Sequence, residues 1–213
     1  PPFPLAMTPE NRIRWLAKPV VWLVCLAPLA QLVWLTATND LGANPQEFMN
    51  RFLGDWAIRL LLVALAVTPL RMLTDWNVVL RFRRLLGLFA FFYIYLHLAS
   101  YVALDQVFNW GEIWKDIVKR WYITVGVAGV LCLLPLAVTS TKGWIKRLGG
   151  RNWNRLHKLV YPAGALACLH FYMMRKGVQL EPIVYAVICL SLLAFRAAYW
   201  LRRRTTARTS SAP

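Results

Sequence analysis

The sequence has few acidic residues, few cysteines and few histidines. Nine Asp and Glu residues stand against 25 Lys and Arg residues among 213, which gives a formal net charge of +16. No carboxylate lies in the interior of the long apolar segments, which argues against a transporter that moves protons along intramembrane acids. The sequence also lacks a strong internal repeat, which argues against an inverted-repeat transporter.

The cysteines stand apart from one another, each within an apolar run, at Cys25, Cys132, Cys168 and Cys189. No C-x-x-C spacing occurs, so neither a zinc site nor a thioredoxin-like redox motif is indicated. We interpret all four as small buried hydrophobic residues.

Apolar residues dominate the chain. They make up 59% of it and the mean hydropathy is +0.46, well above the values of soluble domains. The basic residues fall in short clusters between apolar runs, as positive-inside loops do, and this pattern argues against nucleic acid as a partner. We therefore predict an integral membrane protein in contact with the lipid bilayer.

Six apolar segments are long enough to cross a membrane, because a helix needs ~20 residues to span ~30 Å of hydrocarbon. They lie at about 19–38, 53–71, 85–104, 121–140, 155–174 and 181–200. The predicted fold class is therefore all-α, a bundle of six transmembrane helices over residues 19–200, with loops too short for a soluble domain.

The basic residues also predict the orientation of the bundle. They gather in the loops after the second and fourth segments and near both ends of the sequence, so the positive-inside rule places both termini in the cytoplasm. Residues 1–18 are then a cytoplasmic segment, and residues 201–213 are a basic, disordered cytoplasmic tail.

All three histidines lie in or at the edge of these segments, at His97, His157 and His170. At ~1.5 Å of rise per residue, His97 lies about 20 Å and His170 about 22 Å from the cytoplasmic ends of their segments, whereas His157 lies about 3 Å in. Two histidines at matching depth on different helices are suited to hold the iron of one haem b between them. The alternative is that each is a hydrogen-bonded packing residue.

His157 has no histidine opposite it, because the facing position of the third segment is near Arg83 or Arg84. We therefore treat it as a candidate ligand of a second haem or another cofactor. Pro162 lies between His157 and His170 and is a candidate site for a kink.

Arg59 lies roughly 5–10 Å inside the periplasmic face and is a candidate partner for the propionates of a haem. The alternatives are that it reaches back to the interface or pairs with Asp55 four residues earlier. A second group of basic residues could hold a phosphate on the cytoplasmic side, or could serve only as positive-inside charges. This group consists of Arg81, Arg83, Arg84, Lys146, Arg147 and Arg151.

Three stretches of the chain resemble the MsrQ (YedZ) family, whose members are haem-binding membrane subunits related to ferric-reductase-like transmembrane domains. They are NPQEFMNRFLGDWAIRLLLVALAVTPLR at 44–71, RRLLGLFAFFYIYLHLASY at 83–101, and TSTKGWIKRLGGRNWNRLHKLVYPAGALACLHFY at 139–172. The likeness extends over nearly all of residues 19–200.

The resemblance implies a bacterial inner-membrane protein that binds haem b and FMN, with motif histidines matching His97, His157 and His170. It implies electron transfer from the quinone pool, or from a cytoplasmic flavin reductase, to a periplasmic molybdenum-cofactor enzyme. That partner would reduce methionine sulfoxide in oxidised envelope proteins. Larger relatives carry two histidines on each of two helices, whereas this sequence has Arg83 and Arg84 where the fourth histidine would be, so two bis-histidine haems are not expected.

Two other functions stay open at this point. One is a quinol or ferric reductase similar to cytochrome b561, which would act without a methionine-sulfoxide reductase. The other is a cofactor-free membrane anchor for a periplasmic enzyme, which would be colourless and would tolerate replacement of the histidines.

Overall fold

The computed structural model describes residue 11 and residues 13–175 and 179–209, and all regular structure in these residues is helical. The α-helices are α2 (Lys18–Ala37), α3 (Pro45–Thr74), α4 (Leu80–Ser100), α5 (Trp110–Lys119), α6 (Trp121–Val138), α7 (Lys142–Leu156), α8 (Val160–Met174) and α9 (Leu180–Thr209). Single turns join or extend them, namely the π-helical η1 (Ile13–Ala17) and η3 (Tyr101–Asp105) and the 3₁₀-helical η2 (Asn77–Val79) and η4 (His157–Leu159). The predicted all-α class is confirmed.

Five helical segments are long and apolar enough to cross a membrane. They are Trp15–Ala37, Pro45–Thr74, Asn77–Asp105, Trp121–Val138 and Leu180–Arg202. They correspond to five of the six predicted segments, and many of their large apolar side chains are exposed, as lipid-facing residues are. The chain is therefore a multi-pass membrane protein.

The predicted segment 155–174 is not one continuous α-helix. α7 ends at Leu156, η4 follows, and α8 begins only at Val160. The 3₁₀ turn lies just before Pro162, which occupies the first turn of α8, where its missing N–H leaves no helical bond unmade. Because α8 and η4 together rise about 28 Å, a sixth crossing here is a proposal that the dimensions allow.

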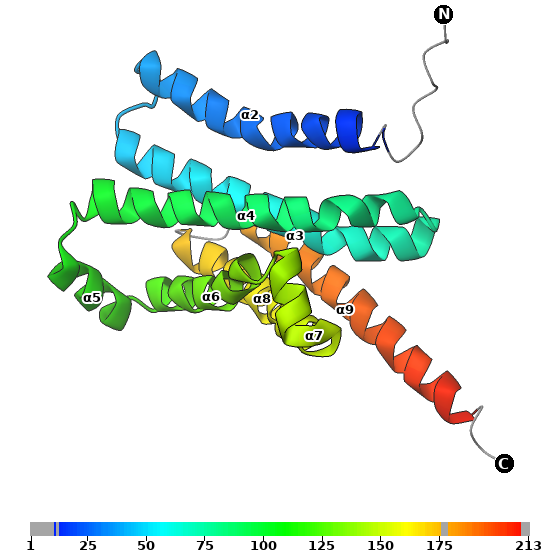
Figure 1. Ribbon diagram of the computed structural model, residues 1–213. Coiled ribbons are helices and arrows are strands. Elements are labelled where there is room, and N and C mark those ends of the chain that lie inside the picture. Colours follow the sequence, from blue (N-terminus) through cyan, green and yellow to red (C-terminus); the bar gives the residue numbers. More distant parts are fainter. Residues whose placement is uncertain (1–10, 12, 176–178, 210–213) are drawn as a thin grey trace, which may run out of the picture.

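The helices form two layers with α2 and α9 on the outside (Figure 1). α3 and α4 pack along each other as an antiparallel hairpin, α6 packs along α8, and α9 crosses α3 and α8. α2 begins, and α9 ends, at the end of the bundle that also carries the α3–α4 turn and α7. We call this the basic end (residues 71–84 and 142–158), and the opposite one the α5 end (residues 38–51 and 105–121).

The Tyr93 side chain forms hydrogen bonds with two backbone groups of α2. Pro28 interrupts this helix, and the Tyr93 hydroxyl lies in the opened turn. It donates to the Cys25 carbonyl oxygen at 2.8 Å and accepts from the Leu29 N–H at 3.1 Å. Those two backbone groups would otherwise bond each other, so the phenol joins α4 to α2 by satisfying both.

Replacing Tyr93 by phenylalanine is expected to destabilise the protein by about 1–3 kcal/mol, because two buried backbone groups lose their partner. Thermal unfolding of the purified protein in detergent measures the loss. Tyr95→Phe is the matched control, since the Tyr95 side chain is 61% exposed. Equal melting temperatures for the two variants would contradict the role given to Tyr93.

Candidate functional site

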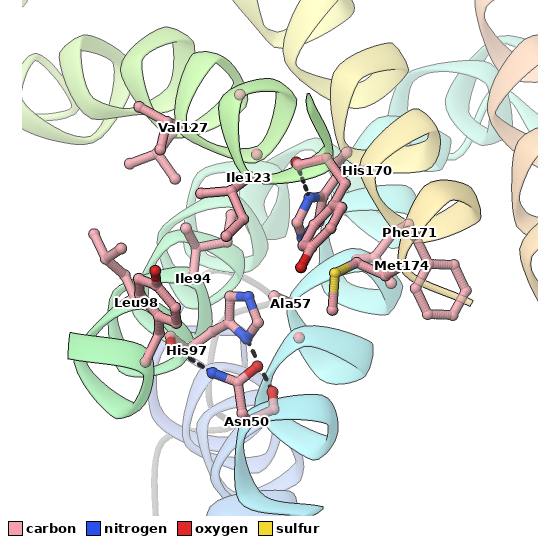
Figure 2. Close-up of a pocket in the computed structure, with 18 of the residues that line it drawn as sticks. Asn50, Ala57, Ile94, His97, Leu98, Ile123, Val127, His170, Phe171 and Met174 are labelled. Carbon is pink, nitrogen blue, oxygen red and sulfur yellow. Dashed lines mark hydrogen bonds between the residues drawn. The ribbon is translucent and has the colours of Figure 1, made fainter. Parts of the chain in front are cut away.

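A cavity of about 400 Å³ lies between α3, α4, α6 and α8, and η3 and α5 cover it at the α5 end. His97 enters it from α4 and His170 from α8, so the two rings face each other across it (Figure 2). The structure thus brings together the two histidines that the sequence places at matching depth.

The two imidazoles are held in the same way. His97 Nδ1 lies 2.9 Å from the Asn50 carbonyl oxygen, and His170 Nδ1 lies 2.7 Å from the Tyr122 carbonyl oxygen. A carbonyl oxygen only accepts, so each Nδ1 carries the proton, and each neutral ring keeps the lone pair of Nε2 for another partner. Metal-binding histidines are typically oriented by such a bond on their second nitrogen.

The spacing of the rings suits one metal ion between them. Their centroids are 6.3 Å apart, and their planes are inclined at 74°. Two metal–nitrogen bonds of about 2 Å each, plus about 1.2 Å from each nitrogen to its ring centre, also place the centroids about 6 Å apart. Two histidine nitrogens fill only two coordination positions of an iron ion. The pair therefore suits an iron whose other ligands belong to the cofactor itself, as the porphyrin nitrogens do in haem.

Two glycines make room for the rings. A Cβ on Gly54 would lie 3.2 Å from His97 Nδ1, and a Cβ on Gly126 would lie 2.8 Å from His170 Nδ1. Each glycine comes four residues, about one helical turn, after the residue whose carbonyl holds that histidine. α3 and α6 therefore hold the two histidines in the same way. Each contributes a carbonyl oxygen that accepts from Nδ1 and, one turn later, a glycine that leaves space for the ring.

Asn50 also fixes the main chain of His97. Its side-chain amide donates to the His97 carbonyl at 3.3 Å and to the Ser100 hydroxyl at 3.0 Å, and that hydroxyl donates to the same carbonyl at 2.8 Å. Sequence reasoning missed Asn50 because it precedes the predicted segment 53–71. It also missed Gly54 and Gly126, although an isolated glycine in a helix costs about 1 kcal/mol and is thereby a signal of close packing.

The cavity is mostly apolar, and its charged residues gather toward the α5 end. They are Arg51, Asp55, Asp105, Arg120 and Arg175. Arg175 lies 3.3 Å from Asp55 and 3.6 Å from Glu181, and Arg120 lies 3.1 Å from the buried Asp116. The site therefore has an apolar body with ionic groups at one side, which suits an amphiphilic ligand.

Arg59 lies outside the lining of this cavity. Its guanidinium donates to Glu181 at 3.0 Å and to the Tyr185 hydroxyl at 2.7 Å, and it lies over the Trp56 ring. Among the described residues Arg59 forms its ion pair with Glu181, and Asp55 forms its own with Arg175. Arg59 thus has a carboxylate partner that lies far along the chain.

His157 lies near the basic end and does not line the cavity. Its ring stacks on Trp153 with centroids 3.7 Å apart, and its Nε2 lies 3.2 Å from the Thr139 hydroxyl. That hydroxyl donates to the Pro135 carbonyl oxygen, so it accepts from His157.

The basic phosphate candidates lie at the start of α4 and along α7, and all of them are exposed. They are Arg81, Arg83, Arg84, Lys146, Arg147 and Arg151. Arg147 lies over the Trp144 ring of its own helix. None of the six lines the cavity that holds His97 and His170.

Comparison with known families agrees with this architecture. The family described as "Ferric reductase like transmembrane component" matches residues 53–168, which include His97 and His157 and end two residues before His170. The fold is thus that of a ferric-reductase-like membrane protein.

Closer relatives cover nearly the whole chain. A "Protein-methionine-sulfoxide reductase heme-binding subunit MsrQ" from Rhodospirillum rubrum is 52% identical over 199 residues, covering 92% of this chain and 94% of the relative. Proteins with the same description from Caulobacter vibrioides and Xanthomonas axonopodis pv. citri are 47% identical over 191 residues and 50% identical over 206. They cover 90% and 92% of this chain, and 90% and 93% of their own lengths. The chain belongs to the MsrQ family.

Proposed function

We propose that this chain binds haem b with His97 and His170 as axial ligands and serves as a membrane electron-transfer subunit. The observation that carries the proposal is the facing pair of imidazoles, 6.3 Å apart, each with Nδ1 bonded to a carbonyl. The relatives described as heme-binding subunits supply the identity of the group. When bound, haem supplies one-electron chemistry at iron, and the protein supplies ligands, orientation and charge.

The residues around the histidines fit a flat, amphiphilic group. Gly54, Ala57, Gly126 and Gly129 line the cavity with almost no side chain, which leaves space between the helices. Arg51, Arg120 and Arg175 bring positive charge to the α5 end, where carboxylates such as haem propionates need it. We assign the propionates to these arginines in preference to Arg59, because they line the cavity and Arg59 does not.

One haem per chain is our proposal for this site. His157 already shares its Nε2 proton with Thr139 and stacks on Trp153. A second haem at His157 would require that ring to leave both partners and would need a ligand other than histidine opposite it. We therefore assign His157 to packing at the basic end.

The direction of transfer that we propose rests on the family resemblance together with the proposed topology, six crossings of the bacterial inner membrane with both termini in the cytoplasm. Electrons enter at the basic end from quinol or from a cytoplasmic flavin reductase, where FMN is the flavin that the family resemblance implies. They leave at the α5 end to a periplasmic, molybdenum-containing methionine-sulfoxide reductase. The physiological role is the repair of oxidised envelope proteins.

A reduced-minus-oxidised absorbance spectrum of the purified full chain tests the proposal. A b-type band and a haem-to-protein ratio near one are expected, and a colourless protein would favour the cofactor-free anchor. Adding a periplasmic methionine-sulfoxide reductase and methionine sulfoxide to the reduced protein is expected to reoxidise it. A b-type band without such reoxidation would favour a reductase similar to cytochrome b561.

A further inference from the structure

The short helix α5 lies between two membrane-spanning segments and connects the end of α4 to the start of α6 (Figure 1). Its inner face holds Ile113 and Asp116, and both are buried. The Asp116 carboxylate accepts from the Tyr101 hydroxyl at 2.8 Å and from the Gln106 side-chain amide at 3.1 Å. Ile113 and Ile117 also line the cavity that holds the histidine pair. One face of α5 therefore covers this cavity.

The rest of α5 is exposed and divides into two faces of different chemistry. One face is apolar, and its residues recur every four positions, at Trp110, Trp114 and Val118. They expose 64–68% of their surface. The other face is charged and consists of Glu112, Lys115 and Lys119, with Lys115 3.1 Å from Glu112. Separate apolar and charged exposed faces are typical of a helix that lies in the plane of a membrane surface.

The turn before α5 presents two further apolar side chains. Val107 and Phe108 are 74% and 59% exposed, and their φ angles are 44° and 59°. This left-handed region is unfavourable for residues other than glycine, and most of all for a β-branched residue such as valine. The Phe108 N–H donates to the Val102 carbonyl oxygen at 2.9 Å and so holds the turn in this form. Burial of the two side chains in a lipid layer would offset the cost of the turn, whereas exposure to water adds to it.

The neighbouring segments place α5 at the boundary of the hydrocarbon layer. The segment Trp121–Val138 has 18 residues and rises about 27 Å, slightly less than the ~30 Å of hydrocarbon that it must cross. Its first residue, Trp121, therefore lies at that boundary, with 75% of its surface exposed. α5 ends at Lys119, two residues earlier, and it begins only five residues after the preceding segment ends at Asp105. Both ends of α5 are thus tethered close to the membrane surface.

We propose that α5 and the turn before it lie in the interface of the phospholipid bilayer at the α5 end of the bundle. The side chains that enter the headgroup region are Val107, Phe108, Trp110, Trp114 and Val118. Tryptophan prefers this layer, because its ring is apolar and its indole N–H can bond to headgroups and water. Only Arg120 separates α5 from α6, whose exposed apolar side chains face lipid, so the same lipid surface is the partner that we assign to α5. The bilayer then holds in place the helix that covers the cavity.

Fluorescence of the full chain in bilayers of phosphatidylethanolamine and phosphatidylglycerol tests this placement. A nitrobenzoxadiazole label is attached to Trp114→Cys, on the apolar face, or to Lys115→Cys, its neighbour on the charged face. Compared with the Lys115→Cys control, the label on Trp114→Cys is expected to be quenched about twofold more by lipids with a nitroxide near the headgroup, and about twofold less by aqueous iodide. The unsubstituted chain gives the labelling background, since its four cysteines are buried or half-buried.

Phe108→Cys serves as a second labelled variant, and the same quenching as for Trp114→Cys is expected. Circular dichroism checks that each variant is folded. Labels at both apolar positions that respond as the Lys115→Cys label does would overturn the proposal, since the face would then lie in water and suit a protein partner. Stronger quenching by a nitroxide deep in the acyl chains would also overturn it, because α5 would then be part of a membrane crossing. The labels report on the bilayer alone, so none of these outcomes depends on bound haem.

Discussion

Replacing His97 or His170 by alanine is expected to abolish the b-type absorbance of the purified protein. Each imidazole supplies one of two nitrogens that face each other across the cavity, and a centroid separation of 6.3 Å leaves room for a single metal. If both rings are axial ligands as proposed, losing one would remove half of the protein's bonds to the iron. The haem-to-protein ratio after purification, measured from the reduced spectrum, reports the loss.

His157→Ala is the matched control for this experiment. The His157 ring lies on Trp153 and against Thr139, outside the cavity lining. We therefore expect this variant to keep the haem band, with a lower melting temperature from the lost packing. Loss of the band in His157→Ala but not in His170→Ala would reject the ligand assignment.

Gly126→Ala is expected to lower haem content severalfold, and Gly54→Ala to lower it less. The new Cβ would lie 2.8 Å from His170 Nδ1 in the first case and 3.2 Å from His97 Nδ1 in the second. The shorter distance forces the His170 ring away from the Tyr122 carbonyl and so misaligns its Nε2. Haem content per chain, compared among variants purified in parallel, measures the effect.

Gly87→Ala provides the control, because a Cβ there meets no atom within 4 Å. Alanine stabilises the interior of a helix by about 0.5–1 kcal/mol relative to glycine, so a loss of haem in the other two variants cannot come from helix propensity. If all three variants kept the same haem content, the glycines would have no part in seating the histidines.

Hydropathy predicts that the chain is a membrane protein, and helical rise predicts that His97 and His170 lie at the same depth, where they can face each other. Both are local properties: ~20 apolar residues span the hydrocarbon layer, and a fixed rise converts residue number into depth. Five of the predicted segments recur as long apolar helices for this reason. The sixth differs because the backbone hydrogen bonding changes from α7 through η4 to α8, which a hydropathy pattern does not contain.

Which side chains form ion pairs and hydrogen bonds with each other, by contrast, is decided by the tertiary structure. Arg59 has Asp55 one turn away in sequence, yet it pairs with Glu181, because α9 packs against α3 and Arg175 takes Asp55. Likewise, neither histidine could be assigned its carbonyl from sequence, since Asn50 and Tyr122 lie 47 and 48 residues away.

The sequence by itself therefore determined that this is a multi-pass, all-α membrane protein with two histidines at one depth. Only the tertiary structure decided which ring nitrogen of each histidine is left to bind a metal, and which glycines make room for the rings. Depth depends on position along one helix, whereas ring orientation depends on the packing of α4 on α3 and of α8 on α6.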